Sequence, residues 1–294
     1  MKKLYGIMPP IATPFLNDEI AFDKLAENLS KWNKTDLSGY VVMGSNGESV
    51  FLTRDEKLKL VEAVKKNIPD EKLLIAGTGS DSVKETVSLT NESAERGADY
   101  ALILTPSFYK SEMKPAAYIK YFYAVADRTN IPVIIYNVPK FTGVDIEPET
   151  VAQLAKHPNI VGIKNSAENL RQTAELVSMT SNDFATITGT GSVLYASLTV
   201  GAVGGILALA NIAPNECVKI QKLVEEGNHP EAVKLQQKML PVNKAITAKY
   251  GVAGLKAALD MLGYFGGEPR LPLSPLHDSD KELLKNILTE AGLL

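Results

Sequence analysis

Residues 159–166, Asn-Ile-Val-Gly-Ile-Lys-Asn-Ser, contain the pattern that decides the fold. A short apolar run without polar alternation, Ile160 to Ile163, ends directly in Lys164. Continuous apolar runs of this kind are typical of parallel strands that are covered on both faces. The segment therefore predicts a buried parallel strand that carries an ammonium group at its carboxyl end.

The same pattern of apolar run, polar or Gly-rich turn and helical stretch recurs along the chain. Thr53 with Glu56 and Ser82 with Glu85 have the spacing of capping boxes at two of the helix starts. Strands that alternate with helices favour a closed (β/α)8 barrel (TIM barrel) of class α/β over an open doubly wound sheet. The eight expected strands are 6–12, 39–43, 73–77, 100–104, 133–136, 161–164, 185–189 and 204–208.

The last expected strand ends near residue 208, and from Pro214 onward the apolar spacing is purely helical. We therefore divide the chain into a (β/α)8 barrel catalytic domain, residues 1–213, and a C-terminal helical extension packed on the barrel, residues 214–294. The length of 294 residues suits this fold, because such barrels run to about 250 residues before extensions.

Composition and charge exclude several classes of protein. Hydrophobic residues make up 45% and charged residues 22%, which is ordinary for a globular protein. The net charge is -3 without a long basic run, so we expect neither nucleic acid nor a membrane as partner. The first residues lack the apolar region of a secretory signal, and Cys217 is the only cysteine. A cytoplasmic enzyme is the expectation.

The carboxyl ends of the strands are where barrels of this class place their active sites. The residues that follow the expected strands are rich in Ser, Thr, Tyr and Gly, and none of the three histidines is among them. Glu48 offers the one carboxylate there. Zinc needs several His, Cys, Asp or Glu ligands, and magnesium needs more than one carboxylate oxygen. We therefore expect no metal site.

Lys164 is the strongest candidate for chemistry. A desolvated lysine has a lowered pKa, and the neutral amine can attack a carbonyl to form a Schiff base. The residues alone leave open a simpler alternative, in which Lys164 pairs with Glu48 or Glu168 at the barrel rim. Tyr136 ends the neighbouring strand, and its phenol could relay protons beside the amine. The two strand ends together favour catalysis.

Two Gly-rich turns follow other strands. The first, Gly-Ser-Asn-Gly-Glu at 44–48, offers backbone N–H groups and the side chains of Ser45 and Asn46 to a carboxylate or phosphate. The second, Gly-Thr-Gly-Ser at 189–192, follows the seventh strand, where barrels often bind phosphate. The sequence does not decide between the two anions.

Four motifs in order along the chain, GSNGE, TPSFY, YNVP and VGIKNS, resemble the strand ends of the pyruvate-dependent class I aldolases. This family includes dihydrodipicolinate synthase, N-acetylneuraminate lyase and 4-hydroxy-2-oxoglutarate aldolase. The resemblance covers nearly the whole chain. It implies a (β/α)8 barrel with a helical tail, usually a homotetramer. It also implies a carbon–carbon lyase that acts on pyruvate and an aldehyde through a covalent lysine–pyruvate imine, without metal or organic cofactor.

The resemblance implies a role for each site residue. Lys164 would form the Schiff base with pyruvate, and Tyr136 would shuttle protons. Ser45 and Asn46 fall where family members hold the pyruvate carboxylate, with Ser45 also in the proton relay. Other positions that would line the substrate pocket are Gly189, Ile206, Phe108 and Phe141.

The third member of the relay departs from the family pattern. Family members usually donate a tyrosine across a subunit interface from the loop after the fourth strand. Phe108 stands at that position here and Tyr109 follows it. Either Tyr109 takes the role through a shift of the loop, or the relay is incomplete.

The residues after YNVP guide the choice within the family. Dihydrodipicolinate synthases usually carry an arginine there, which binds the carboxylate of the aldehyde. Phe141 stands in its place and cannot pair with a carboxylate. Lys140 is adjacent, but neighbouring side chains point in different directions, so we do not expect it to substitute. The motifs GAVGGILALAN, YGVAGLK and GYFGGEPRLPL resemble the 4-hydroxy-2-oxoglutarate aldolases and related sugar-acid aldolases more closely.

The sequence therefore predicts an aldolase that cleaves a 4-hydroxy-2-oxo acid to pyruvate and an aldehyde. Two alternatives stay open. One is 4-hydroxy-tetrahydrodipicolinate synthase, which condenses pyruvate with aspartate semialdehyde in lysine biosynthesis. The other is a non-catalytic ligand-binding relative, against which the presence of both Lys164 and Tyr136 argues.

Overall fold

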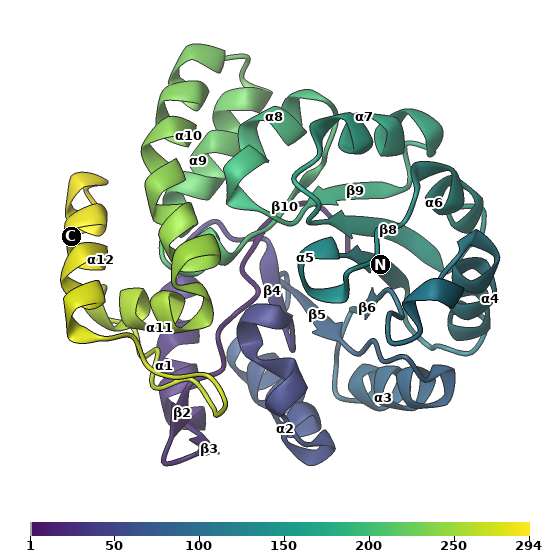
Figure 1. Cartoon of the computed structure of the whole chain (residues 1–294), viewed down its shortest axis with the longest axis horizontal. Coiled ribbons are helices and arrows are strands. Elements are labelled where there is room, and N and C mark those ends of the chain that lie inside the picture. The colour runs from purple at the N-terminus through teal and green to yellow at the C-terminus, as the bar shows by residue number, and fades with distance from the viewer. Residues whose placement is uncertain (1) are drawn as a thin grey trace.

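The parallel sheet at the centre of the molecule closes into a barrel (Figure 1). The computed structural model describes residues 2–294. Its eight barrel strands are hydrogen-bonded in the order β1-β10-β9-β8-β7-β6-β5-β4, and all these pairs are parallel. At the remaining seam the N–H of Ile11 donates to the carbonyl of Val41 at 3.0 Å. The predicted (β/α)8 barrel is confirmed.

The barrel strands agree with the predicted ranges to within a few residues. The first strand is shorter than predicted because Pro9 and Pro10 have no N–H to donate to the ladder. The last is shorter because Ala208–Asn211 form a 3-10 turn. The strands are β1 Gly6–Met8, β4 Gly39–Val42, β5 Leu73–Gly77, β6 Tyr100–Leu104, β7 Val133–Asn137, β8 Ile160–Asn165, β9 Ala185–Thr188 and β10 Gly204–Ile206.

A small antiparallel hairpin, β2 Phe15–Leu16 and β3 Glu19–Ile20, follows β1 outside the barrel. A helix then follows each barrel strand, and a short extra helix, α5 Pro139–Thr142, comes directly after β7. The helices that surround the barrel are α1 Phe22–Trp32, α2 Arg54–Asn67, α3 Val83–Glu95, α4 Pro115–Ala126, α6 Pro148–Leu154, α7 Leu170–Met179, α8 Leu194–Thr199 and α9 Pro214–Glu225.

Three further helices lie together on one side of the barrel in Figure 1: α10 His229–Lys244, α11 Gly251–Met261 and α12 Asp278–Glu290. One π-helical turn, η6 Ala245–Lys249, joins α10 to α11. The division at residues 213/214 stays a prediction. It would assign α9, which contacts β1 and α8, to the helical extension.

The side chains along each strand alternate between the barrel interior and the surrounding helices. On β7, Ile134 and Tyr136 belong to the buried interior cluster, whereas Ile135 packs among the helices outside. Tyr136 pairs in register with Lys164 on β8, and Ile163 again faces outward. Because of this alternation both polar side chains lie on the inner side of the barrel, at its carboxyl end.

The two predicted capping boxes have different outcomes. At the start of α2 the Thr53 side chain accepts from the N–H of Glu56, whose carboxylate accepts from the N–H of Thr53 at 2.7 Å. At the start of α3 only half of the box forms. Ser82 Oγ accepts from the N–H of Glu85 at 3.3 Å, but the Glu85 carboxylate pairs with Arg54 instead. The prediction of a second capping box was therefore wrong in one of its two hydrogen bonds, the one from the N–H of Ser82 to the Glu85 carboxylate.

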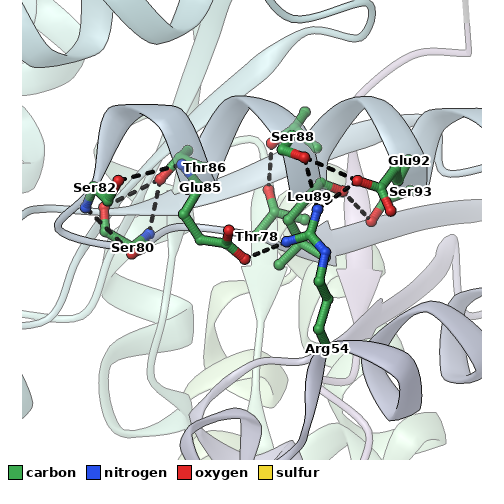
Figure 2. Close-up of polar contacts among 11 residues, drawn as sticks. Arg54, Thr78, Ser80, Ser82, Glu85, Thr86, Ser88, Leu89, Glu92 and Ser93 are labelled. Atoms are coloured by element: carbon green, nitrogen blue, oxygen red, sulfur yellow. Dashed lines mark hydrogen bonds and ion pairs between the residues drawn. The ribbon is translucent and has the colours of Figure 1, made fainter.

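Arg54 connects α2 to α3, as Figure 2 shows. Its guanidinium group binds the carboxylates of both Glu85 and Glu92 on α3. On the same helix, Thr86 Oγ1 accepts from the N–H of Ser80 at 3.0 Å, in the turn that follows β5. The polar contacts of α3 therefore fix both a neighbouring helix and a turn at the carboxyl end of the barrel.

Arg270 connects the segment between α11 and α12 to α2. Its guanidinium group donates to both carboxylate oxygens of Glu56, at 2.7 and 3.0 Å. It also donates to the carbonyl of Phe51 at 2.9 Å. The hydrogen bonds from Arg270 lower the pKa of the Glu56 carboxyl to about 2. This pair therefore stabilises the fold only while the carboxyl is ionised.

We expect Glu56→Gln to destabilise the protein more at neutral pH than in acid. The pKa of Glu56 falls from 4.5 to about 2 on folding, so its contribution is complete above about pH 4.5 and is lost as the pH falls through about 2. The free energy of unfolding in urea measures this at about pH 7 and about pH 3, where the loss caused by the substitution should shrink.

The control for this experiment is Glu62→Gln. Glu62 is exposed on the same helix and makes no ion pair anywhere in residues 2–294. It should change the free energy of unfolding little at either pH. If Glu56→Gln lowers the free energy of unfolding equally at both pH values, the ionised carboxylate of Glu56 does not stabilise the fold.

Candidate active site

Lys164 and Tyr136 lie side by side at the carboxyl ends of β8 and β7. They are register partners in the parallel pair. The Lys164 Nζ lies 4.2 Å from the centroid of the Tyr136 ring. Lys164 is only 2% exposed and Tyr136 only 7%. The structure therefore brings the two predicted residues together in the way the strand ends suggested.

Lys164 has no carboxylate partner. Within residues 2–294 no Asp or Glu oxygen lies within the 4.0 Å of an ion pair with its Nζ. Glu48 pairs with Lys256 instead, and Glu168 accepts a hydrogen bond from Thr190 at 2.9 Å. The simpler alternative for Lys164, an ion pair at the barrel rim, is wrong. A buried amine without a counter-ion is suited to act as a nucleophile.

Ser45 completes a chain of polar groups beside the lysine. It lies on a one-turn 3-10 helix, η1 Ser45–Gly47, that follows β4. Its Oγ lies 3.3 Å from the hydroxyl of Tyr136, so either group can donate. Thr13 Oγ1 donates to the carbonyl of Gly47 at 2.7 Å and holds the turn against the chain that follows β1. Ser45 and Tyr136 are therefore placed to pass a proton between them.

Asn46 is half-buried in the same turn. In the described part of the chain its side-chain amide makes no hydrogen bond. Asn46 is not among the residues that line the cavity described next, so its predicted role in binding a carboxylate stays a prediction.

A cavity of about 660 Å³ lies at this end of the barrel, and Ser45 and Tyr136 both line it. A larger cavity of about 990 Å³ lies between the β2–β3 hairpin and α11. It contains none of the residues discussed above as chemical candidates. The smaller cavity is therefore the candidate active site.

Lys140 and Phe141 both line the cavity. They lie on α5, where successive side chains diverge by about 100° around a single turn. Two such side chains can border one cavity when the turn itself lies at its edge. The Lys140 Nζ also donates to the carbonyl of Thr247 in η6 at 3.1 Å. This bond places a cation at the mouth of the site.

Phe108 and Tyr109 lie outside the cavity of their own chain. They are 78% and 70% exposed, and their rings make an edge-to-face contact at 5.1 Å. Asp81 holds their loop, because its carboxylate accepts from the N–H groups of Ser107 at 2.6 Å and Phe108 at 3.0 Å. Their predicted part in the site stays a prediction.

Gly189 directly follows β9, and Ile206 is the last residue of β10. The N–H of Gly189 donates to the carbonyl of Asn165, the residue after Lys164, at 2.7 Å. A Cβ at position 189 would lie 1.8 Å from Ser166 Oγ, so only glycine fits this approach. Ile206 is fully buried in the same interior cluster as Tyr136. Neither lines the cavity that Ser45 and Tyr136 line, so their predicted part in the substrate pocket stays a prediction.

Two features of the site were missed in the sequence. The first is η6, whose π-helical turn places Thr247 and Lys249 in the cavity wall. Such turns are common at functional sites, but the sequence pattern around Lys249 reads as ordinary helix. The second is the buried pair of Glu48 and Lys256. The only signal for it was the single carboxylate among the strand-end residues.

Between residues 2 and 294, no three His, Cys, Asp or Glu side chains converge as they would around a metal ion. Over the same residues, no helix has both the length and the apolar character that are needed to cross a bilayer.

The fold and these side chains define a (β/α)8 barrel with an amine and a phenol at the carboxyl ends of its strands, a site suited to carbonyl chemistry. The chain belongs to the Dihydrodipicolinate synthetase family, whose profile it matches over residues 3–291. Membership confirms the predicted class of enzyme, a pyruvate-dependent Schiff-base lyase that acts on carbon–carbon bonds.

Several relatives match almost the whole length of this chain. A protein of Thermodesulfovibrio yellowstonii is 37% identical over 98% of this chain and 99% of its own. One of Methanothrix thermoacetophila is 35% identical over 97% of this chain and 96% of its own. Both are named 4-hydroxy-tetrahydrodipicolinate synthase. A solved structure of a monomeric dihydrodipicolinate synthase variant is 30% identical, with a TM-score of 0.95 over 100% of this chain and 98% of its own.

These relatives overturn the prediction of a 4-hydroxy-2-oxoglutarate or sugar-acid aldolase. They carry the name of the synthase, not of the aldolase. The wrong choice depended on Phe141, which cannot bind a carboxylate, and on the likeness of the motifs GAVGGILALAN, YGVAGLK and GYFGGEPRLPL to those of the aldolases. Lys140 lines the same cavity as Phe141, so the absence of an arginine does not leave this wall without a basic side chain. Membership of an enzyme family also favours catalysis over the non-catalytic alternative.

Proposed function

We propose that this chain is a 4-hydroxy-tetrahydrodipicolinate synthase, which condenses pyruvate with aspartate semialdehyde through an imine on Lys164. The observation that carries the proposal is the buried, unpaired Lys164 beside Tyr136, with Ser45 in contact with the phenol. The names of the relatives support the choice of acceptor.

In the first half of the reaction, the amine of Lys164 attacks C2 of pyruvate and water leaves, which forms the imine. Ser45 and Asn46 would hold the pyruvate carboxylate, since both offer polar groups from the turn after β4. Loss of a methyl proton then gives an enamine, because the protonated imine accepts the electrons of the C–H bond. Tyr136 is placed to take up and return protons.

In the second half, the enamine carbon attacks the aldehyde carbon of aspartate semialdehyde, and the new alkoxide takes a proton. The amino group of the acceptor then attacks the imine carbon and displaces Lys164, which closes the ring. The sum is one molecule of each substrate converted to one product and one water. Lys164 leaves the reaction as the amine that entered it.

The acceptor carries a carboxylate, and the cavity offers lysines to bind it. Lys140 and Lys249 both line the cavity, and neither makes an ion pair within residues 2–294. Glu48 also lines it, but its charge is taken by Lys256. The Lys140 ammonium uses one bond on Thr247, which leaves two donors for a ligand. We propose that Lys140 supplies the charge that Phe141 lacks.

The exposed aromatic pair fits a role between subunits. We propose a homotetramer in which Tyr109 reaches the cavity of a neighbouring subunit and Phe108 packs beside it. Their exposure in the single chain supports this, as does the loop fixed by Asp81. The monomeric variant among the similar structures shows that assembly varies among these proteins.

We expect the purified protein to consume pyruvate and aspartate semialdehyde together. Mass spectrometry should find a product whose mass is the sum of both substrates less one water, because ring closure releases the lysine without a second hydrolysis. 4-Hydroxy-2-oxoglutarate and 2-keto-3-deoxy sugar acids serve as controls and should release little pyruvate. Faster release of pyruvate from one of these acids than condensation with the semialdehyde would overturn the proposal.

We expect Lys140→Met to raise the KM for aspartate semialdehyde roughly tenfold, the equivalent of about 1.4 kcal/mol for a lost charged contact. The KM for pyruvate should change less than the KM for the semialdehyde, because pyruvate is held by the turn after β4. Steady-state kinetics with each substrate varied in turn measures both constants.

Lys110→Met is the matched control. Lys110 approaches Gly143 just after α5, yet it does not line the cavity. This substitution should leave both KM values near those of the wild type. Equal effects of the two substitutions would mean that the general positive charge near α5 matters and that Lys140 has no specific role.

A further inference from the structure

The motif YGVAGLK, at residues 250–256, ends in a lysine that the proposed reaction does not use. Lys256 lies on α11, in the helical part of the chain, and Glu48 directly follows the catalytic turn Ser45–Gly47. The Lys256 Nζ lies 2.6 Å from Glu48 Oε1, and the two side chains are 1% and 0% exposed. A buried ion pair therefore joins α11 to the turn that carries Ser45.

Both charges of this pair have further partners. The Lys256 Nζ donates to the carbonyl of Glu268 at 2.9 Å and lies 4.4 Å from the centroid of the Phe15 ring. The second oxygen of Glu48 accepts from the backbone N–H of Arg270 at 2.8 Å. A Cβ on Gly266 would lie 2.1 Å from the carbonyl oxygen of Lys256. The chain at Gly266 therefore lies so close to α11 that a side chain at this position would not fit. The pair is enclosed on all sides.

The backbone of Glu48 shows what the pair achieves. Its φ of 56° and ψ of 35° are left-handed, which is uncommon for a residue other than glycine. It separates two one-turn 3-10 helices, Ser45–Gly47 and Ser49–Phe51. Such a conformation persists when the surroundings fix it. The bonds from Lys256 and from the backbone of Arg270 hold both carboxylate oxygens of Glu48 and so fix the residue that follows the turn.

We infer that Lys256 is a positioning residue for pyruvate, which acts through Glu48 to hold Ser45 and Asn46 where they bind the pyruvate carboxylate. This inference rests on the proposed function of that turn. A buried ion pair adds little stability compared with apolar residues of similar size. Its value here is therefore the fixed geometry of the turn, and Lys256 acts on the site from α11, whose residues 251–253 also line the cavity.

The double variant Glu48→Gln/Lys256→Met tests the inference, because it removes both charges and leaves neither buried alone. The readout is the pyruvate concentration that gives half the maximal rate of inactivation by borohydride, which needs no acceptor. We expect this concentration to rise about tenfold, as for the loss of one hydrogen bond to a charged group. The thermal midpoint should stay close to that of the wild type.

Lys72→Met is the matched control. Lys72 is also buried and donates to the carbonyls of Thr35 and Leu37, but it directly precedes β5 at the opposite end of the barrel. It should lower the thermal midpoint without changing the pyruvate concentration at half-maximal inactivation. Glu48→Asp is a second test if the double variant does not fold. It keeps the charge, withdraws the carboxylate by one methylene and should also weaken pyruvate binding.

The outcomes separate the inference from the proposed function. If the wild type is not inactivated in a pyruvate-dependent way, the proposed function fails, and the inference fails with it. If the wild type is inactivated but the double variant and Glu48→Asp need no more pyruvate, only the inference is overturned. If Lys72→Met weakens pyruvate binding as much as the double variant does, a general loss of stability explains the effect, and the positioning role is again refuted.

Discussion

A buried amine without a counter-ion is the constraint on which the rest of the structure depends. Transfer of an unpaired charged group into a protein interior is costly, so buried lysines are usually paired with a carboxylate. Lys164 is 2% exposed and has no carboxylate within ion-pair distance in the described chain. The closed barrel provides this environment, because parallel strands deliver side chains to an interior end that the following turns can cover.

The surrounding charges are arranged so that Lys164 stays unpaired. The carboxylate in the cavity wall, Glu48, is held by Lys256 and by the backbone of Arg270. Burial lowers the pKa of Lys256, and Glu48 acts against that shift. Two exposed lysines, Lys140 and Lys249, line the cavity wall. One ion pair thus both removes a competing carboxylate and fixes the turn that carries Ser45.

Much of the fold followed from the sequence, because apolar runs and cap residues act locally. The barrel strands, the cap at Thr53 and the meeting of Lys164 with Tyr136 depend on spacing along single segments. The failures involve segments far apart. Glu85 pairs with Arg54 on another helix and does not complete the cap at Ser82. Glu48 lies 208 residues from its partner Lys256. The wrong substrate came from judging the site by Phe141 alone, because the sequence did not show that Lys140 and Lys249 border the same cavity.

The central claim is that Lys164, and no other lysine, forms the imine with pyruvate. Its most direct test is to reduce the protein with borohydride in the presence of pyruvate, digest it and map the modified peptide by mass spectrometry. We expect one adduct, on Lys164, with the mass of pyruvate bound through a reduced imine. An adduct on Lys140, Lys249 or Lys256 in its place, or none at all, would contradict it.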